Sequence, residues 1–251
     1  MRHCEYIRNQ KDSKTAVLLI HGIVGTPDHF RDFIELIPKK WSVHNILLDG
    51  HGKGVKEFAA SSMEKWKEQV DEHLQMLFAE NERVIIVAHS MGTLFAIQAA
   101  VKYPQKIKKL FLLAVPLRVH MRLRVLLANM KVALNMGGND ATVNAMMRDC
   151  SVKTVGSRPW DYIGWAPRFT ELLKEAKTVR KMIHLLQVPT FSYQSENDDL
   201  VSLKSCKYLD SNPNITNTVL CESGHFGYTE KENLVVLEDF QKLMDDEEKQ
   251  A

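Results

Sequence analysis

The stretch that decides the fold is Arg83-Val84-Ile85-Ile86-Val87-Ala88-His89-Ser90-Met91-Gly92. It starts as a short, almost continuously apolar run over 83–88, which is typical of a strand buried on both faces of a parallel sheet. From position 90 to a proline at 104 the residues favour a helix. A strand that turns sharply into a helix at a serine holds the hydroxyl clear of the backbone, and it needs small residues two positions before and after that serine. Ala88 and Gly92 meet this need, so Ser90 is a candidate nucleophile.

The rest of the chain alternates between strands and helices. Short apolar runs predict strands at 16–20, 42–48, 107–115 and 188–193, with a weaker one at 217–221. Apolar residues spaced by three and four predict helices at 27–37, 63–78 and 231–245. This alternation predicts an α/β fold, with a mostly parallel sheet covered by helices on both faces. A chain of 251 residues of this kind is expected to form one large domain.

The alternation breaks between positions 116 and 187, where no strand is predicted. This segment is rich in methionine and contains Trp160 and Trp165. We interpret 116–187 as a helical cap, inserted into a core made of 1–115 and 188–251. Its methionine and tryptophan side chains would suit a pocket for an acyl chain, but they are equally typical of ordinary core packing.

A nucleophilic serine needs partners elsewhere in the chain. Its hydroxyl is a weak nucleophile without a base, and the oxyanion formed by its attack needs hydrogen-bond donors. The loop His21-Gly22-Ile23-Val24-Gly25-Thr26 follows the first predicted strand, and its glycines let it turn beneath the nucleophile. We expect the backbone N–H of Ile23 to act with that of Met91 as the oxyanion pair. Met91 would also lie near the positive end of the helix that follows Ser90.

Five motifs, taken together and in order, resemble those of the α/β-hydrolase superfamily. They are His21-Gly22, Asp49-Gly50-His51-Gly52, Ala88-His89-Ser90-Met91-Gly92, Asn197-Asp198-Asp199-Leu200-Val201 and Ser223-Gly224-His225. Within that superfamily the chain is similar to the small carboxylesterases and the monoacylglycerol-lipase-like enzymes, apart from the cap. The order serine, acid, histidine is the family's order. Ala88 departs from the pattern, because a glycine is commoner there.

The resemblance implies that His225 is the general base and that an acid after the fifth predicted strand orients it. Two adjacent carboxylates compete for that role. The family's acid precedes two residues and then a valine, so Asp198 fits the pattern better, and Asp199 stays open as the alternative. Dehalogenases and epoxide hydrolases of this fold need an aspartate nucleophile, which position 90 lacks. We therefore expect acyl transfer to water.

The residues and the resemblance together predict a carboxylesterase. We expect it to cleave short to medium acyl esters or monoacylglycerols through an acyl-enzyme on Ser90. An aminopeptidase or amidase, an acyltransferase and a non-catalytic ligand-binding receptor are the alternatives, because one fold can serve all of them. No cofactor is expected, and no metal, because His21, His51 and His89 have loop-shaping roles in the family.

Charge and composition bear on partners and location. A formal net charge of +2 provides no field of the kind that gathers nucleic acid, so no nucleic-acid partner is expected. The sequence has no recognisable signal peptide, no apolar run that would span a bilayer and only four scattered cysteines, which favours the cytoplasm. A basic stretch at 118–131 would allow peripheral contact of the cap with an anionic membrane, or it is a solvated helix face. The oligomeric state is left open.

Overall fold

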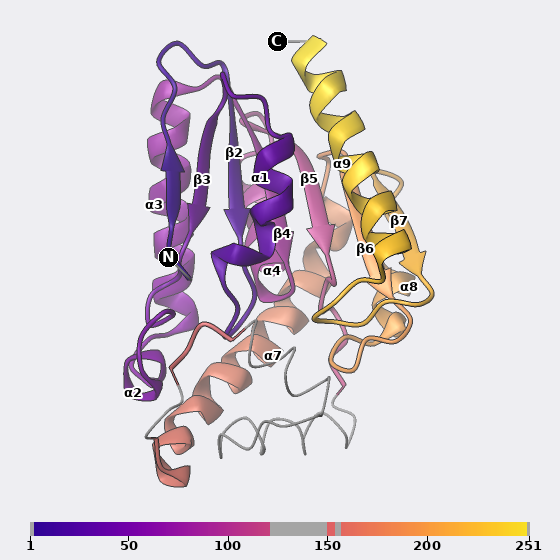
Figure 1. The fold of residues 1–251 in the computed structure, drawn as a ribbon. Coiled ribbons are helices and arrows are strands. Elements are labelled where there is room, and N and C mark those ends of the chain that lie inside the picture. The colour runs from indigo at the N-terminus through magenta and orange to yellow at the C-terminus, as the bar shows by residue number, and fades with distance from the viewer. Residues whose placement is uncertain (1–2, 121–149, 154–156, 250–251) are drawn as a thin grey trace.

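The computed structural model describes residues 3–120, 150–153 and 157–249. They form a seven-stranded sheet in the order β1-β3-β2-β4-β5-β6-β7 (Figure 1). Neighbouring strands are parallel except β1, which runs antiparallel to β3. The predicted mostly parallel sheet is therefore confirmed. The strands are β1 Tyr6–Arg8, β2 Thr15–Ile20, β3 Ser42–Ile46, β4 Arg83–His89, β5 Ile107–Leu113, β6 Thr190–Ser195 and β7 Ile215–Leu220.

The helices predicted outside 116–187 form in the predicted order with small differences in extent, whereas the short helices at 55–59 and 206–209 were not predicted. The predicted helix at 27–37 forms as a 3-10 turn followed by α1, and the last predicted helix extends to position 249. Glu247, near the end of that helix, is buried and pairs with Lys109 of β5 at 2.9 Å. The helices are α1 Arg31–Leu36, α2 Val55–Ala59, α3 Met63–Glu80, α4 Met91–Lys102, α7 Ala166–Met182, α8 Cys206–Leu209 and α9 Glu230–Lys249, and the 3-10 turns are η1 Pro27–Phe30, η2 Pro159–Trp165, η3 Ile183–Leu185 and η4 Leu203–Ser205.

Strand β1 was not predicted from the sequence. It has three residues at the outer edge of the sheet, and Tyr6 and Ile7 are exposed. It is held by pairing with β3 and by Arg8, whose guanidinium donates hydrogen bonds to the carbonyls of Trp41 and Pro38 at 3.0 and 2.9 Å. A strand this short and exposed has no apolar run from which it could be recognised.

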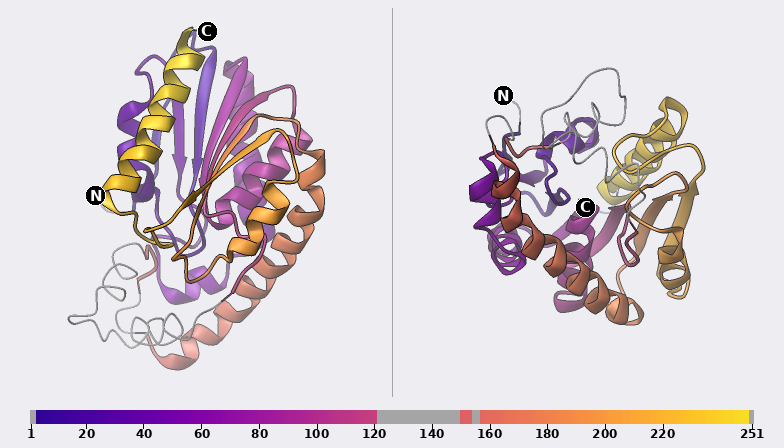
Figure 2. Two further views of the ribbon diagram at one scale, coloured as in Figure 1. Left: turned by 90° about the vertical axis from the view of Figure 1, so that its right-hand side faces the viewer. Right: turned by 90° about the horizontal axis from the view of Figure 1, so that it is seen from below.

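Helices cover both faces of the sheet, as predicted (Figure 2). Helices α1 and α9 pack on one face, and α3, α4 and α7 pack on the other. In β2 the side chains alternate between them: Val17 and Leu19 join the first core, while Leu18 and Ile20 join the second. Because successive side chains of a strand point to opposite faces, two covered faces require the continuous apolar runs seen in the sequence.

The region predicted as a cap includes one long helix that covers the sheet. Helix α7 packs against α3 and α4, and Leu172, Ala176 and Val179 are buried in the shared core. Much of the remaining predicted cap falls on 121–149 and 154–156, which lie outside the described residues. The division of the chain into core and cap therefore stays a prediction.

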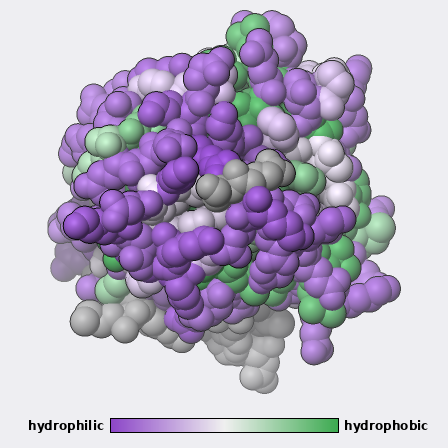
Figure 3. All heavy atoms as spheres, turned by 90° about the horizontal axis from the view of Figure 1, so that it is seen from above, coloured by the Kyte–Doolittle hydropathy of each residue, from purple (hydrophilic) through white to green (hydrophobic). Residues whose placement is uncertain are grey.

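The loops that carry the five motifs all follow the carboxyl ends of strands, along the lower edge of the sheet in Figure 1. Parallel strands bring such loops together at one edge, which is the usual place for a ligand site in α/β folds. The face at the opposite edge is covered mainly by hydrophilic side chains (Figure 3). Among the described helices, none is both long and apolar enough to cross a bilayer.

A close backbone approach joins the end of β2 to the start of α4. A Cβ built at Gly92 would lie 2.3 Å from the carbonyl oxygen of Ile20 and 2.8 Å from that of His21. Both distances are far below van der Waals contact, and both neighbours are backbone atoms. Only glycine allows α4 to start this close to β2.

We predict that Gly92→Ala lowers the free energy of unfolding by about 3 kcal/mol, because the strand or the helix has to shift to admit the methyl group. Gly227→Ala is a matched control: a Cβ there would meet nothing within 4 Å, and Gly227 has no positive φ. Urea denaturation of both variants measures the difference. Equal stability of the two variants would contradict the prediction.

Candidate active site

Ser90 lies in the sharp turn between β4 and α4. Its backbone has φ 51° and ψ −122°, a conformation that costs a residue with a side chain about 1–3 kcal/mol. Hydrogen bonds hold the turn: the Ser90 N–H donates to the carbonyl of Leu113 at 2.8 Å, and the Thr93 hydroxyl donates to the Ser90 carbonyl at 2.6 Å. The serine is therefore fixed by its backbone, at the place that the sequence predicted.

His225 and Asp198 meet between the loops that follow β7 and β6. The Nδ1 of His225 lies 2.7 Å from the Oδ2 of Asp198, and both side chains are buried. The other carboxylate oxygen, Oδ1, accepts hydrogen bonds from the N–H groups of Leu200 and Val201, each at 2.7 Å. Of the two adjacent carboxylates considered from the sequence, Asp198 makes these contacts with His225 and with the loop backbone, whereas none of them involves Asp199.

These contacts keep Asp198 ionised. Burial alone would raise the pKa of its carboxyl group, but the neighbouring His225 and the two backbone N–H donors outweigh burial and lower the pKa. An ionised Asp198 accepts a hydrogen bond from His225 Nδ1–H, which leaves Nε2 as the nitrogen with a free lone pair. The His225–Asp198 pair thus has the geometry of a general base whose ring is oriented by a carboxylate.

Glu232 of α9 organises the loop that carries His225. Its carboxylate accepts hydrogen bonds from the N–H groups of Cys221 and Glu222 at 2.7 and 3.0 Å, and from the Ser223 hydroxyl. Glu232 was not predicted from the sequence. The available signal was Thr229-Glu230-Lys231-Glu232, a capping-box pattern at the start of α9. Here the glutamate reaches back to the His225 loop.

His89 connects the nucleophile turn to the His225 loop. Its Nε2 donates a hydrogen bond to the His225 carbonyl at 3.2 Å, and its ring lies 4.1 Å from that of His29, centroid to centroid. Burial lowers the pKa of His89 well below its ordinary value, and His29 and His225 add to the shift. Burial and His225 likewise lower the pKa of His29 to about 4. Two neutral imidazoles therefore flank the candidate base.

The contacts of the described residues include no hydrogen bond between the Ser90 hydroxyl and His225. The two residues are linked through neighbouring His89, whose side chain donates to the His225 carbonyl, and each of the two is about 6% exposed. In enzymes without substrate such a bond is often long, and it shortens when substrate binds.

The loop after β2 lies directly against Ser90. A Cβ built at Gly22 would lie 2.8 Å from the Cβ of Ser90, so the next residue, Ile23, is close to the nucleophile. The loop turns back through a hydrogen bond from the Gly25 N–H to the Gly22 carbonyl at 3.0 Å, and Val24 within it has φ 51°. Among the described residues, the N–H groups of Ile23 and Met91 donate to no backbone or side-chain acceptor.

His21, at the start of this loop, links it to Leu48, which follows β3. The N–H of Leu48 donates to His21 Nε2 at 3.1 Å, so His21 Nδ1 carries the proton that it shares with the Gly22 carbonyl at 2.8 Å. Burial, more than neighbouring His51, lowers the pKa of His21 well below its ordinary value.

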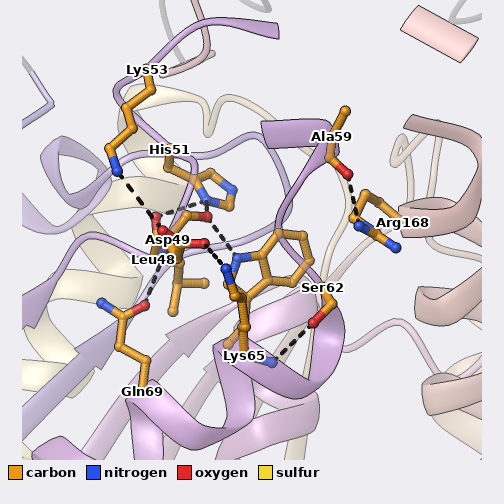
Figure 4. A network of polar contacts seen from close by, with 10 residues as sticks. Leu48, Asp49, His51, Lys53, Ala59, Ser62, Lys65, Gln69 and Arg168 are labelled. Carbon is orange, nitrogen blue, oxygen red and sulfur yellow. Dashed lines mark hydrogen bonds and ion pairs between the residues drawn. The ribbon is translucent and has the colours of Figure 1, made fainter. Parts of the chain in front are cut away.

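The loop after β3, which contains Asp49 and His51, is itself tied down (Figure 4). The Asp49 N–H donates to the Gln69 side chain at 2.8 Å, and Trp66 Nε1 donates to the Asp49 carbonyl at 2.8 Å. The Asp49 carboxylate lies 3.5 Å from the ammonium of Lys65. His51 contacts the same loop through its Nδ1, which lies 3.1 Å from the Leu48 carbonyl oxygen, and its ring centroid lies 4.7 Å from that of His21.

The chain matches the model of one protein family, Hydrolase_4, described as serine aminopeptidase, S33, over residues 11–224. The chain belongs to this family. It is therefore a member of the α/β-hydrolase superfamily, as the five motifs predicted. The match includes Ser90 and Asp198 and stops one residue before His225.

Several proteins are similar to this chain at low sequence identity or over a short stretch. Uncharacterised proteins of Mycobacterium tuberculosis and Mycobacterium bovis are 32% identical to it over 102 residues, a match that covers 41% of this chain and only 29% of theirs. A structure from work on LipS and LipT, two metagenome-derived lipolytic enzymes, has a TM-score of 0.73 at 17% identity, covering 97% of this chain and 98% of that one. The monoacylglycerol lipase of Paleococcus ferrophilus has a TM-score of 0.68 at 17% identity, covering 98% and 99%. At these identities the structures establish the α/β-hydrolase fold alone.

We predict that this protein loses stability steeply as pH falls from about 6.5 to 4. His21, His29, His51 and His89 have lowered pKa values in the fold, two of them to about 4, so unfolding takes up protons in this range. Each histidine that stays neutral in the fold contributes a slope of about 1.4 kcal/mol per pH unit. Urea denaturation at pH 7.5, 6.5 and 5.5 measures the total slope.

The variant His51→Asn tests this prediction at a single residue. Because His51 is buried with a pKa of about 4, replacing it should reduce the slope of stability against pH by about 1.4 kcal/mol per pH unit, the contribution of one proton. His184→Asn replaces an exposed histidine and serves as the control. An unchanged slope in His51→Asn would show that buried histidines do not cause the acid sensitivity.

Proposed function

We propose that this protein is a serine esterase, with Ser90 as the nucleophile, His225 as the general base and Asp198 as the acid that orients it. The observation that carries the proposal is the 2.7 Å contact between His225 and Asp198, at the edge of the sheet where Ser90 sits in its sharp turn. The N–H groups of Ile23 and Met91 are the proposed oxyanion donors. Met91 is the first residue of α4, so its N–H lies at the positive end of the helix dipole.

The reaction follows from these roles. His225 Nε2 accepts the Ser90 hydroxyl proton as the serine oxygen bonds to the ester carbonyl carbon. The carbonyl oxygen becomes an oxyanion and accepts hydrogen bonds from the two N–H groups. When the intermediate collapses, the bond to the alcohol breaks and the alcohol leaves with the proton from His225. Water then gives a proton to His225 and attacks the acyl-enzyme, which releases the acid and returns the proton to Ser90.

The proposed substrates are short to medium acyl esters or monoacylglycerols. The likeness to lipolytic enzymes and to a monoacylglycerol lipase supports this class. A second candidate, hydrolysis of an N-terminal peptide bond, is favoured by the family's description as serine aminopeptidase. Both candidates use the same acyl-enzyme, so the leaving group distinguishes them.

We predict that the purified protein hydrolyses p-nitrophenyl butyrate and that Ser90→Ala reduces kcat by about 10⁴-fold or more, because no other group replaces the nucleophile. A fluorophosphonate should label the wild-type protein stoichiometrically at Ser90. Aminoacyl nitroanilides, assayed in parallel, test the aminopeptidase candidate through kcat/KM. Tight binding of a small ligand without labelling would instead support a receptor, and undiminished hydrolysis by Ser90→Ala would refute the proposal.

The adjacent aspartates offer a matched test of the acid. Asp198→Asn should reduce kcat by about 10⁴-fold, because an amide cannot hold His225 in the required tautomer. Asp199→Asn makes the same chemical change one residue away and should alter kcat by less than about threefold, because it is Asp198 that accepts the hydrogen bond from His225. Steady-state kinetics on p-nitrophenyl butyrate measures both, and a reversed order would assign the role to Asp199.

A further inference from the structure

A residue from the region predicted as a cap contacts the loop that carries Ile23. Ser151 is buried, and its backbone N–H donates a hydrogen bond to the carbonyl of Val24 at 2.9 Å. Its hydroxyl donates to the same oxygen at 3.4 Å. One residue thus supplies two donors to a single carbonyl, next to the proposed oxyanion donor.

That carbonyl belongs to a strained residue. Val24 has φ 51° and is the third residue of the turn closed by the Gly25 N–H and the Gly22 carbonyl. A positive φ at the third position of a turn is usually occupied by glycine or asparagine. A β-branched valine stays in such a conformation only when contacts from outside the turn hold it there. The two donors of Ser151 are such contacts.

Ser151 is itself held in place by its neighbours. Val152 is buried in the core that includes α3 and α4. The Lys153 N–H donates to the Lys53 carbonyl at 2.8 Å, and Lys153 forms a parallel bridge with Gly54. Residues 150–153 are therefore fixed between the loops that follow β2 and β3. Ser151 acts on the turn from a rigid position.

We propose that Ser151 is a positioning residue for the reaction. By holding the Val24 carbonyl, it keeps the turn in the conformation in which the Ile23 N–H faces the developing oxyanion. This inference rests on the proposed function, since it matters only if Ser90 forms a tetrahedral intermediate. The oxyanion forms during the reaction and is absent from bound substrate. Loss of the Ser151 hydrogen bonds to the Val24 carbonyl therefore lowers kcat and leaves KM nearly unchanged.

The test is a double-mutant cycle on p-nitrophenyl butyrate hydrolysis. Ser151→Ala removes one hydrogen bond and keeps the backbone N–H, so kcat should fall about three- to tenfold with KM within about twofold. Ser151→Thr keeps the hydroxyl and should restore kcat. Glycine adopts a positive φ without strain, so in the Val24→Gly background Ser151→Ala should change kcat by less than about twofold.

Ser13→Ala is the matched control. Ser13 is also buried, and its hydroxyl donates to the Thr15 carbonyl at 2.7 Å, at the opposite end of β2, so kcat should not change. An equal loss of kcat in both backgrounds, or no loss in either, would overturn the role of Ser151 while leaving the esterase intact. A wild-type protein that neither hydrolyses esters nor is labelled at Ser90 would overturn the proposed function, and this inference with it.

Discussion

The backbone contact between the end of β2 and the start of α4 is the constraint on which the rest of the site depends. Gly92 lies against the carbonyls of Ile20 and His21, and Gly22 lies against Ser90. Without side chains at these two positions, the nucleophile turn and the loop after β2 can share one small volume. Close backbone packing thus brings Ser90 near the N–H groups proposed to stabilise the oxyanion, independently of any hydrogen bond between them.

The electrostatics of the site follow from burial. Histidines are concentrated around Ser90, yet those with lowered pKa values stay neutral and serve as hydrogen-bonding and packing groups. Asp198 is the exception, because backbone donors and His225 stabilise its charge inside the protein. Asp198 is thus an ionised group in contact with His225, whereas the nearby histidines with lowered pKa values add no charge.

The sequence predicted what depends on local pattern. The apolar runs predicted the central strands, and the small residues on either side of Ser90 predicted the turn. Both features depend only on residues that are neighbours in the sequence. Strand β1 was not predicted because it has no apolar run of its own and forms only by pairing with β3. The contact between Ser151 and Val24 joins segments far apart in the chain, so no local pattern reports it. The capping-box pattern at Glu232 is local, but it does not show that the carboxylate reaches back to residues 221–223. Asp198 and Asp199 differ through the backbone donors at Leu200 and Val201, which only the folded loop reveals.

The tie between Glu232 and the His225 loop has a consequence for the order in which activity appears during synthesis. Ser90 and its turn belong to the first half of the chain, whereas His225 is ordered by a carboxylate of α9, a helix whose far end is anchored through Glu247. A ribosome-bound chain that lacks α9 would already contain the strands around Ser90 but not an ordered base. The proposed hydrolysis would therefore begin only after α9 has been synthesised and has packed on the sheet, when the structure around Ser90 is complete.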